Sequence, residues 1–215
     1  PSGEEGKPQV SPDGTRIAFR ACGRLYVMEI DGDGQMGEGE HPLLVSGNAA
    51  GCTHHAWGDN TWLYFKAGEE DVEDEECASV ADILRTAVPA SIQGATPPTP
   101  EQLTDFDDDD CSNWPSPSPD GTRVAFHRSD GSLHLMNADG SGHQVLLTAG
   151  ETDWNCGPTS WSPNGEWLSF KHWPDDPQGS SIAVVHVNGT YPPETREVTE
   201  DFDDHRQWFS PSGTY

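Results

Sequence analysis

One short segment recurs along this chain, and its spacing constrains the fold more than any other feature. The segment at residues 10–19 (VSPDGTRIAF) returns at 117–126 (PSPDGTRVAF) and at 161–170 (WSPNGEWLSF), with a shorter copy at 57–65 (WGDNTWLYF). A fifth copy begins at Phe209 (FSPSG). The copies start at positions 10, 57, 117, 161 and 209, so they lie 47, 60, 44 and 48 residues apart. A period of about 40–50 residues is typical of the blades of a β-propeller.

Each repeat is predicted to form four short strands, A to D. Pro-Asp-Gly predicts a turn after strand A, since proline presets φ and glycine accepts a positive φ. The next residues alternate in polarity, as a half-buried strand does, and two shorter strands follow. The sequence therefore predicts an all-β propeller of four-stranded antiparallel blades. We place four repeats at about 7–48, 49–105, 106–150 and 151–200, and the first strand of a fifth at 201–215, in a single domain.

The Ser-Pro-Asp-Gly-x-x-Ile/Val-Ala-Phe motif, with Leu-x-Val-Met and an Asp/Asn-x-Asp-Gly turn behind it, resembles the repeat of TolB-type β-propellers. The resemblance covers essentially the whole chain, although the second copy lacks the proline and carries insertions at 69–76 and 88–100. It implies a ring that usually closes about six blades, and contact with proteins through one propeller face. Four repeats and the start of a fifth fit a small propeller, a part of a longer one, or a last strand that completes a blade in a neighbouring copy.

Composition excludes several other classes of protein. The chain has 37 acidic residues against 11 Lys and Arg, a net charge of -26. This balance argues against binding nucleic acid, because phosphates are bound by clustered Lys and Arg. No apolar run approaches the roughly 18–20 residues that a membrane span needs. Eight Trp, seven Phe and four Tyr favour a folded protein over a disordered acidic one, since such rings are usually buried.

Five cysteines, none in a CxxC pair, give no support to a zinc ribbon or a thioredoxin-type site. In a four-stranded meander the D-to-A and B-to-C connections lie on one face, which we call the loop face. Cys52, Cys111 and Cys156 precede strand A and Cys22 and Cys77 follow strand B, so all five map to it. A B-to-C loop should neighbour the D-to-A loop that leaves the same blade. We therefore predict Cys22–Cys52 and Cys77–Cys111 disulfides with Cys156 left over; the alternatives are buried thiols or another pairing.

Several features favour an extracellular or luminal protein. They are the widely spaced cysteines, a Thr/Pro-rich stretch at 95–100 and one glycosylation sequon at Asn188. The sequon falls in a predicted C-to-D turn on the opposite face, where a glycan can be accommodated. The chain begins at Pro1 without an initiator methionine, which we interpret as a mature form or a fragment.

Three acidic clusters, at 69–76, 105–110 and 200–204, map to the loop face. Closely spaced carboxylates supply the hard oxygen ligands that Ca²⁺ takes. The candidate calcium ligands are Asp105, Asp107, Asp109, Asp201, Asp203 and Asp204. The spacing lacks the glycine and bidentate glutamate of an EF-hand, and the alternative is a solvated acidic rim.

Histidines and indoles also gather near strand A. Neutral imidazoles can ligate a metal, and the candidates are His54, His55 and His205. Because no third spaced ligand is identifiable, we expect hydrogen-bonded or exposed histidines instead. Packing between blades is the expected role of the indoles, and stacking on a sugar or a peptide is the alternative. The indoles concerned are Trp57, Trp114, Trp154, Trp161 and Trp208.

The sequence contains no GxSxG, HExxH or P-loop motif. We therefore expect a non-enzymatic, secreted or cell-surface module that binds a protein partner or has a structural role. Trp208 and Phe209 begin an extra strand, which predicts self-assembly by strand exchange into an extracellular polymer. The alternatives are the propeller domain of a larger prolyl-oligopeptidase-like hydrolase and a calcium-dependent propeller enzyme.

Overall fold

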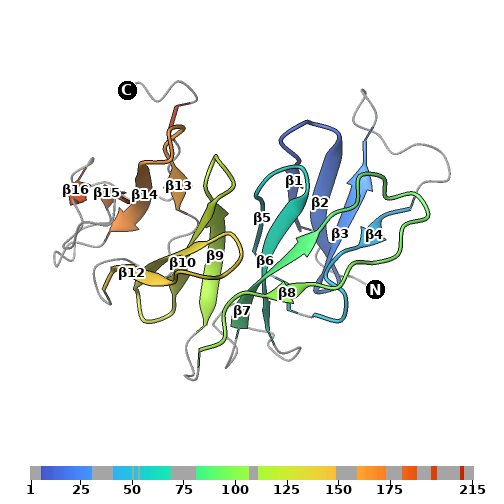
Figure 1. The fold of residues 1–215 in the computed structure, drawn as a ribbon, viewed down its shortest axis with the longest axis horizontal. Coiled ribbons are helices and arrows are strands. Elements are labelled where there is room, and N and C mark those ends of the chain that lie inside the picture. Colours follow the sequence, from blue (N-terminus) through green and yellow to red (C-terminus); the bar gives the residue numbers. More distant parts are fainter. Residues whose placement is uncertain are drawn as a thin grey trace. The chain divides into compact units, whose positions relative to one another are not determined.

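The structure, a computed structural model, consists of four antiparallel sheets with four strands in each (Figure 1). It describes residues 6–30, 41–49, 51–52, 54–68, 81–106, 111–148, 159–172, 181–187, 195–197 and 209–210. The chain divides into two compact units, unit 1 (Pro1–Cys111) and unit 2 (Ser112–Tyr215). Over these described ranges, no helix is long and apolar enough to cross a membrane.

Each predicted repeat forms one sheet, a blade, with its strands in chain order, which confirms the predicted architecture. The first blade contains β1 (Gly6–Val10), β2 (Arg16–Ala21), β3 (Arg24–Glu29) and β4 (Leu43–Leu44). The second contains β5 (His55–Trp57), β6 (Trp62–Gly68), β7 (Ala81–Ala87) and β8 (Glu101–Gln102). The third contains β9 (Ser112–Pro117), β10 (Arg123–Arg128), β11 (Leu133–Asn137) and β12 (Gln144–Leu147). The fourth contains β13 (Ser160–Trp161), β14 (Trp167–His172), β15 (Ser181–His186) and β16 (Thr195–Glu197).

The recurring Ser-Pro-Asp-Gly motif forms the predicted turn, and its polar side chains hold it closed. Asp13 accepts hydrogen bonds from the Ser11 hydroxyl (2.6 Å), the Thr15 amide (3.1 Å) and the Thr15 hydroxyl (2.8 Å). These bonds lower the pKa of Asp13 to about 2. Gly14 has φ +74°, a conformation that side chains rarely adopt. Asp120 accepts the same set of bonds in the third blade.

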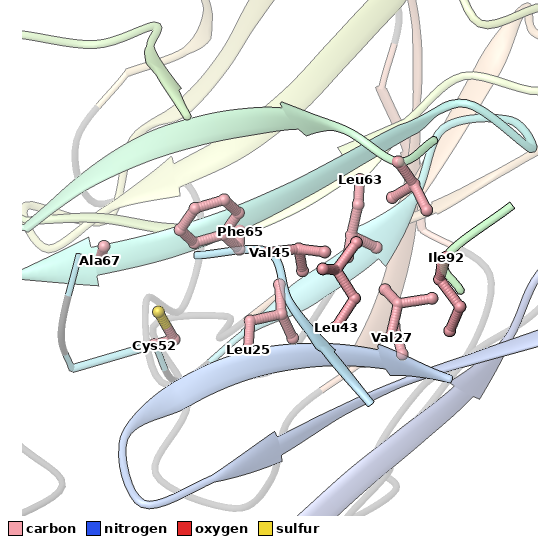
Figure 2. Close-up of a cluster of buried hydrophobic side chains, with 11 residues drawn as sticks. Leu25, Val27, Leu43, Val45, Cys52, Leu63, Phe65, Ala67 and Ile92 are labelled. Carbon is pink, nitrogen blue, oxygen red and sulfur yellow. The ribbon is translucent and has the colours of Figure 1, made fainter. Parts of the chain in front are cut away.

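Within each unit, apolar side chains of the two blades form one core. Figure 2 shows the core of unit 1, where Leu25 and Val27 of β3 face Leu63 and Phe65 of β6. All four side chains are fully buried. Burying one such side chain contributes about 1.5–3 kcal/mol. A second cluster in unit 2 uses the corresponding strands β11 and β14.

An arginine from the first blade of unit 1 reaches across to the second. Arg16 donates hydrogen bonds to the carbonyls of Pro89 (3.1 Å) and Asn60. Its guanidinium carbon lies 5.6 Å from the centroid of the Trp57 ring, within range of a cation–π interaction. The Trp57 indole in turn donates to the Gln9 carbonyl of β1 (3.1 Å). We call this arrangement the arginine clamp.

Unit 2 contains the same arginine clamp. Arg123 donates to the carbonyls of Gly165 (2.7 Å) and Val187 (3.4 Å), and its guanidinium carbon lies 5.1 Å from the Trp161 ring centroid. The Trp161 indole donates to the Ser116 carbonyl (2.8 Å). The expected role of Trp57 and Trp161 in packing between blades is therefore confirmed.

Candidate binding site on the loop face

The first strand of each unit carries a bulge that the turn motif does not explain. In β1, Lys7 precedes Pro8 and has φ 57°, and the pairing with β2 shifts register there. In β9, Trp114 precedes Pro115 and has φ 56°, again beside a register shift. A positive φ strains a residue with a side chain by about 1–3 kcal/mol, and bulges commonly re-aim a side chain. The two bulges therefore give Lys7 and Trp114 special positions.

In unit 1 the bulge places Lys7 among other basic side chains. We call this group the cationic site; it comprises Lys7 (β1), Arg20 (β2), His54, His55 (β5) and Lys66 (β6). Backbone pairing sets the strands: Gly6 pairs with Arg20, and the Lys66 amide donates to the His54 carbonyl at 2.8 Å. Lys7, Arg20 and Lys66 are three of only 11 Lys and Arg in the chain.

The side chains of the cationic site disfavour further positive charge. Burial lowers the pKa of His54 to about 2, and repulsion by Lys7, Lys66 and Arg20 contributes. Burial also lowers the pKa of Lys66 to about 8, with Lys7 as the second cause. Burial lowers the pKa of His55 as well, to about 4. Both histidines are therefore neutral at physiological pH.

His55 is the most buried side chain of the cationic site, with 7% of its surface exposed. Hydrogen bonds to the backbone of Ala18 and Lys7 hold its ring and partly offset the lowering of its pKa. Its Nε2 atom, however, has no hydrogen-bond partner among the residues that the structure describes. A buried polar atom without a partner is costly, and binding sites are one place where it occurs.

The loop connections of the two blades meet beside this site, as expected from the topology. The Cys52 amide donates to the Gly23 carbonyl at 3.0 Å. Cys22 and Cys52 are nevertheless free thiols, so the predicted Cys22–Cys52 disulfide is wrong. Cys22 has φ 48° and its thiol is exposed, whereas Cys52 is buried in the core, with Sγ 3.8 Å from the Ala49 carbonyl. Neighbouring backbones therefore direct the two thiols apart.

The second predicted disulfide stays a prediction. Cys111 is fully buried and disulfide-bonded, and its partner lies outside the described residues. Cys77 and Cys156 also lie outside them, so the pairing Cys77–Cys111 is not tested.

One of the candidate calcium ligands, Asp105, lies within the described residues and is exposed. Burial, with a smaller contribution from Asp105, raises the pKa of Asp82, whose carboxylate accepts hydrogen bonds from Thr104 (2.8 Å) and Gln102 (2.8 Å). Sequence reasoning missed Asp82 because it stands inside strand β7, away from the acidic clusters. Over the described ranges, no three His, Cys, Asp or Glu come together as a metal site. The other candidates lie outside these ranges: Asp107, Asp109, Asp201, Asp203 and Asp204.

The remaining predicted sites are also largely outside the described residues. This holds for Asn188, Trp208 and His205. Phe209 is described and half-buried, without strand structure. Glycosylation and strand exchange therefore stay predictions.

Unit 2 contains a chain of hydrogen bonds that the sequence did not suggest. The Ser132 hydroxyl bonds both Asp130 and His134 Nε2 (2.6 Å), and His134 Nδ1 lies 2.6 Å from His143 Nε2. A carboxylate only accepts, so Ser132 donates to Asp130 and accepts from His134, which then accepts from His143. The Phe126 ring packs against both histidines, and burial lowers the pKa of His134 to about 4.

Solved structures resemble this chain in fold. No family model and no curated protein matches the sequence. A TolB-type protein of Agrobacterium tumefaciens is 20% identical, with a TM-score of 0.65 over 93% of this chain and 63% of its own. Oligogalacturonate lyase of Vibrio parahaemolyticus is 15% identical (TM-score 0.62, 91% of this chain, 53% of the lyase). Prolyl oligopeptidase B of Galerina marginata is 12% identical (TM-score 0.54, 94% and 30%).

These similarities show a TolB-like β-propeller fold, as the repeat motif predicted. The neighbours include both TolB proteins and enzymes, so the fold alone does not separate binding from catalysis. The chain spans less than two thirds of each of these three proteins.

Proposed function

We propose that this chain is a non-enzymatic, extracellular or cell-surface β-propeller that binds a protein partner with its loop face. The cationic site carries the proposal. In a chain of net charge -26, three cations and two histidines converge on the loop face of unit 1. Bringing like charges together is unfavourable, and Lys7 is also held at a strained φ. Unfavourable features concentrated at one place are typical of functional sites.

The scaffold beneath the site supports this interpretation. The arginine clamp and the shared core of unit 1 join the two blades that supply β1, β2, β5 and β6. Side chains held on strands are positioned more firmly than side chains on loops. The proposal includes the extracellular setting, which the cysteine spacing and the sequon support. We also propose that the acidic loops bind calcium and that Trp208 and Phe209 take part in strand exchange. Both proposals rest on the sequence.

The cationic site favours a second candidate function. The Vibrio parahaemolyticus neighbour is a lyase of oligogalacturonate, an acidic sugar polymer. A cluster of Lys, Arg and His also suits sugar carboxylates, so an acidic oligosaccharide is the alternative ligand of this face.

Selective blocking of the loop face tests the proposed function. A maleimide–biotin label on the exposed Cys22, loaded with streptavidin, covers the loop face beside the cationic site. The matched control is the double variant Cys22→Ser/Thr61→Cys, which places the label on an exposed A-to-B turn of the same unit. The chain is cross-linked to surface proteins of the cells that produce it. We expect the label at Cys22 to abolish this cross-linking and the label at position 61 to preserve it. Equal cross-linking with both labels would contradict the proposal.

A further inference from the structure

The cationic site combines charge and an unused hydrogen-bonding atom at one place. Lys7 lies close enough to His54, His55 and Lys66 to alter the pKa of each, and Arg20 does the same for the two histidines. The basic groups come from four strands or their ends, in two blades that a shared core and an arginine clamp hold together. This fixed arrangement suits a ligand with more than one negative group.

His55 supplies the second observation. Its ring is held by backbone hydrogen bonds and is 7% exposed, and its Nε2 has no partner among the described residues. A carboxylate beside Nε2 would favour protonation of the ring, which is neutral without a ligand, and would then accept a hydrogen bond from Nε2–H. The same carboxylate would reduce the repulsion between the ring and the neighbouring cations. A carboxylate would therefore interact favourably with both His55 Nε2 and the neighbouring cations.

The indoles of unit 1 favour a peptide over a sugar as the source of that carboxylate. Sugars usually stack on an open aromatic face. Both indoles described in unit 1 already have an arginine over the ring: Arg16 over Trp57 at 5.6 Å and Arg85 over Trp62 at 4.2 Å. Trp57 also uses its N–H on the Gln9 carbonyl.

We infer that the cationic site of unit 1 binds the side-chain carboxylates of an acidic segment in a protein partner. Lys7, Arg20 and Lys66 provide charge, and His55 Nε2 provides a directed hydrogen bond. The inference rests on the proposed function, because it specifies what the partner presents to the loop face. Tight binding by such paired charges should weaken at high ionic strength.

Fluorescence anisotropy with a labelled poly-glutamate peptide tests the inference on the whole chain. The double variant Lys7→Gln/Lys66→Gln should bind the peptide about tenfold or more weakly than the unmodified chain. The matched control Arg24→Gln/Arg85→Gln removes the same charge from unit 1, where Arg24 bonds the Gly47 carbonyl and Arg85 pairs with Glu101. It should change affinity by less than about threefold. Lys7→Gln alone, at an exposed side chain, is the second variant if the double variant unfolds.

The pH dependence gives an independent readout. Because the pKa of Lys66 is lowered to about 8, the unmodified chain should lose affinity as pH rises through 8. Lys66→Gln should lose this dependence, and the Arg24→Gln/Arg85→Gln control should keep it.

Three results would overturn the inference. Equal losses in the two double variants would mean that only net charge matters. Tighter binding of polygalacturonate than of poly-glutamate, also lost in Lys7→Gln/Lys66→Gln, would make the ligand a sugar. If the peptide does not bind but the Cys22 label still blocks the partner, the inference is wrong and the proposed function is not contradicted. Peptide binding without any effect of that label would instead contradict the proposed function.

Discussion

The two units repeat one two-blade scaffold and differ at the strand ends on the loop face. Arg16 and Arg123 occupy equivalent positions in the first blade of each unit, and each lies over the tryptophan that ends the first strand of the second blade. The bulge in the first strand is also shared, but it presents Lys7 in unit 1 and Trp114 in unit 2. The common parts are those that join blades. The residues that differ lie at the bulge on the loop face, where we propose that a partner binds. This indicates that the scaffold serves stability in both units, whereas the residue at the bulge determines binding.

Removing the clamp should have the largest effect, and the same one in both units. Arg16→Ala and Arg123→Ala each delete two hydrogen bonds from a charged donor and a cation–π contact. We expect each to lower the free energy of unfolding by about 3 kcal/mol in urea titrations. The control Arg24→Ala removes an arginine that donates to the Gly47 carbonyl within its own blade, and should cost about 1 kcal/mol. A loss below about 1 kcal/mol at Arg16 with a full loss at Arg123 would break the equivalence of the units.

Acid should destabilise both units through different histidines. Burial lowers the pKa of His55 in unit 1 and of His134 in unit 2 to about 4, from 6.5. Because the neutral ring is favoured in the folded state, stability is complete above pH 6.5 and falls as pH drops toward 4. Each residue should contribute about 3 kcal/mol to this fall.

Unfolding measured across this range in His55→Gln and His134→Gln checks the contribution of each histidine. Each variant should show a flatter pH profile than the unmodified chain. An unchanged profile in either variant would show that its histidine does not titrate as described.

Relieving the strain at the bulge should separate stability from binding in unit 1. Lys7→Gly removes both the strained φ and the charge, so thermal unfolding should show a gain of about 1 kcal/mol while peptide affinity falls. Lys7→Ala keeps the strain and loses the charge, and serves as the control. If Lys7→Gly were no more stable than Lys7→Ala, the positive φ at position 7 would not be a source of strain.

The smallest expected effect concerns the two thiols of unit 1. Burial raises the pKa of Cys52 to about 11, so its thiolate is scarce at neutral pH, whereas Cys22 is exposed. Maleimide should label Cys22 and leave Cys52 unmodified, as peptide mass spectrometry would show. Labelling of Cys52 in the folded chain would contradict its place in the core.

The sequence predicted the parts of the fold that depend on local chemistry. The Ser-Pro-Asp-Gly turn is determined by neighbouring residues, such as Ser11, Asp13 and Gly14, so it could be recognised in each repeat. The period of the repeats predicted the four blades. The arginine clamp was missed because its acceptors are backbone carbonyls of another blade, which leave no sequence signal.

Side-chain direction was the main source of error at the candidate site. The loops of Cys22 and Cys52 were correctly predicted to be neighbours, but the positive φ of Cys22 and the burial of Cys52 separate their thiols. The cationic site leaves little local sequence signal, because Lys7, Arg20 and Lys66 lie in different strands. The Lys7-Pro8 and Trp114-Pro115 pairs, at matching repeat positions, were a usable signal.

The central claim is that the loop face of unit 1, through its cationic site, is where this chain binds a partner. Nuclear magnetic resonance of the histidine rings during titration with poly-glutamate tests it most directly. The account predicts that the ring nitrogens of His55 and His54 shift as peptide binds, while those of His134 and His143 in unit 2 stay in place. Shifts confined to His134 and His143, or equal shifts in both units, would contradict it.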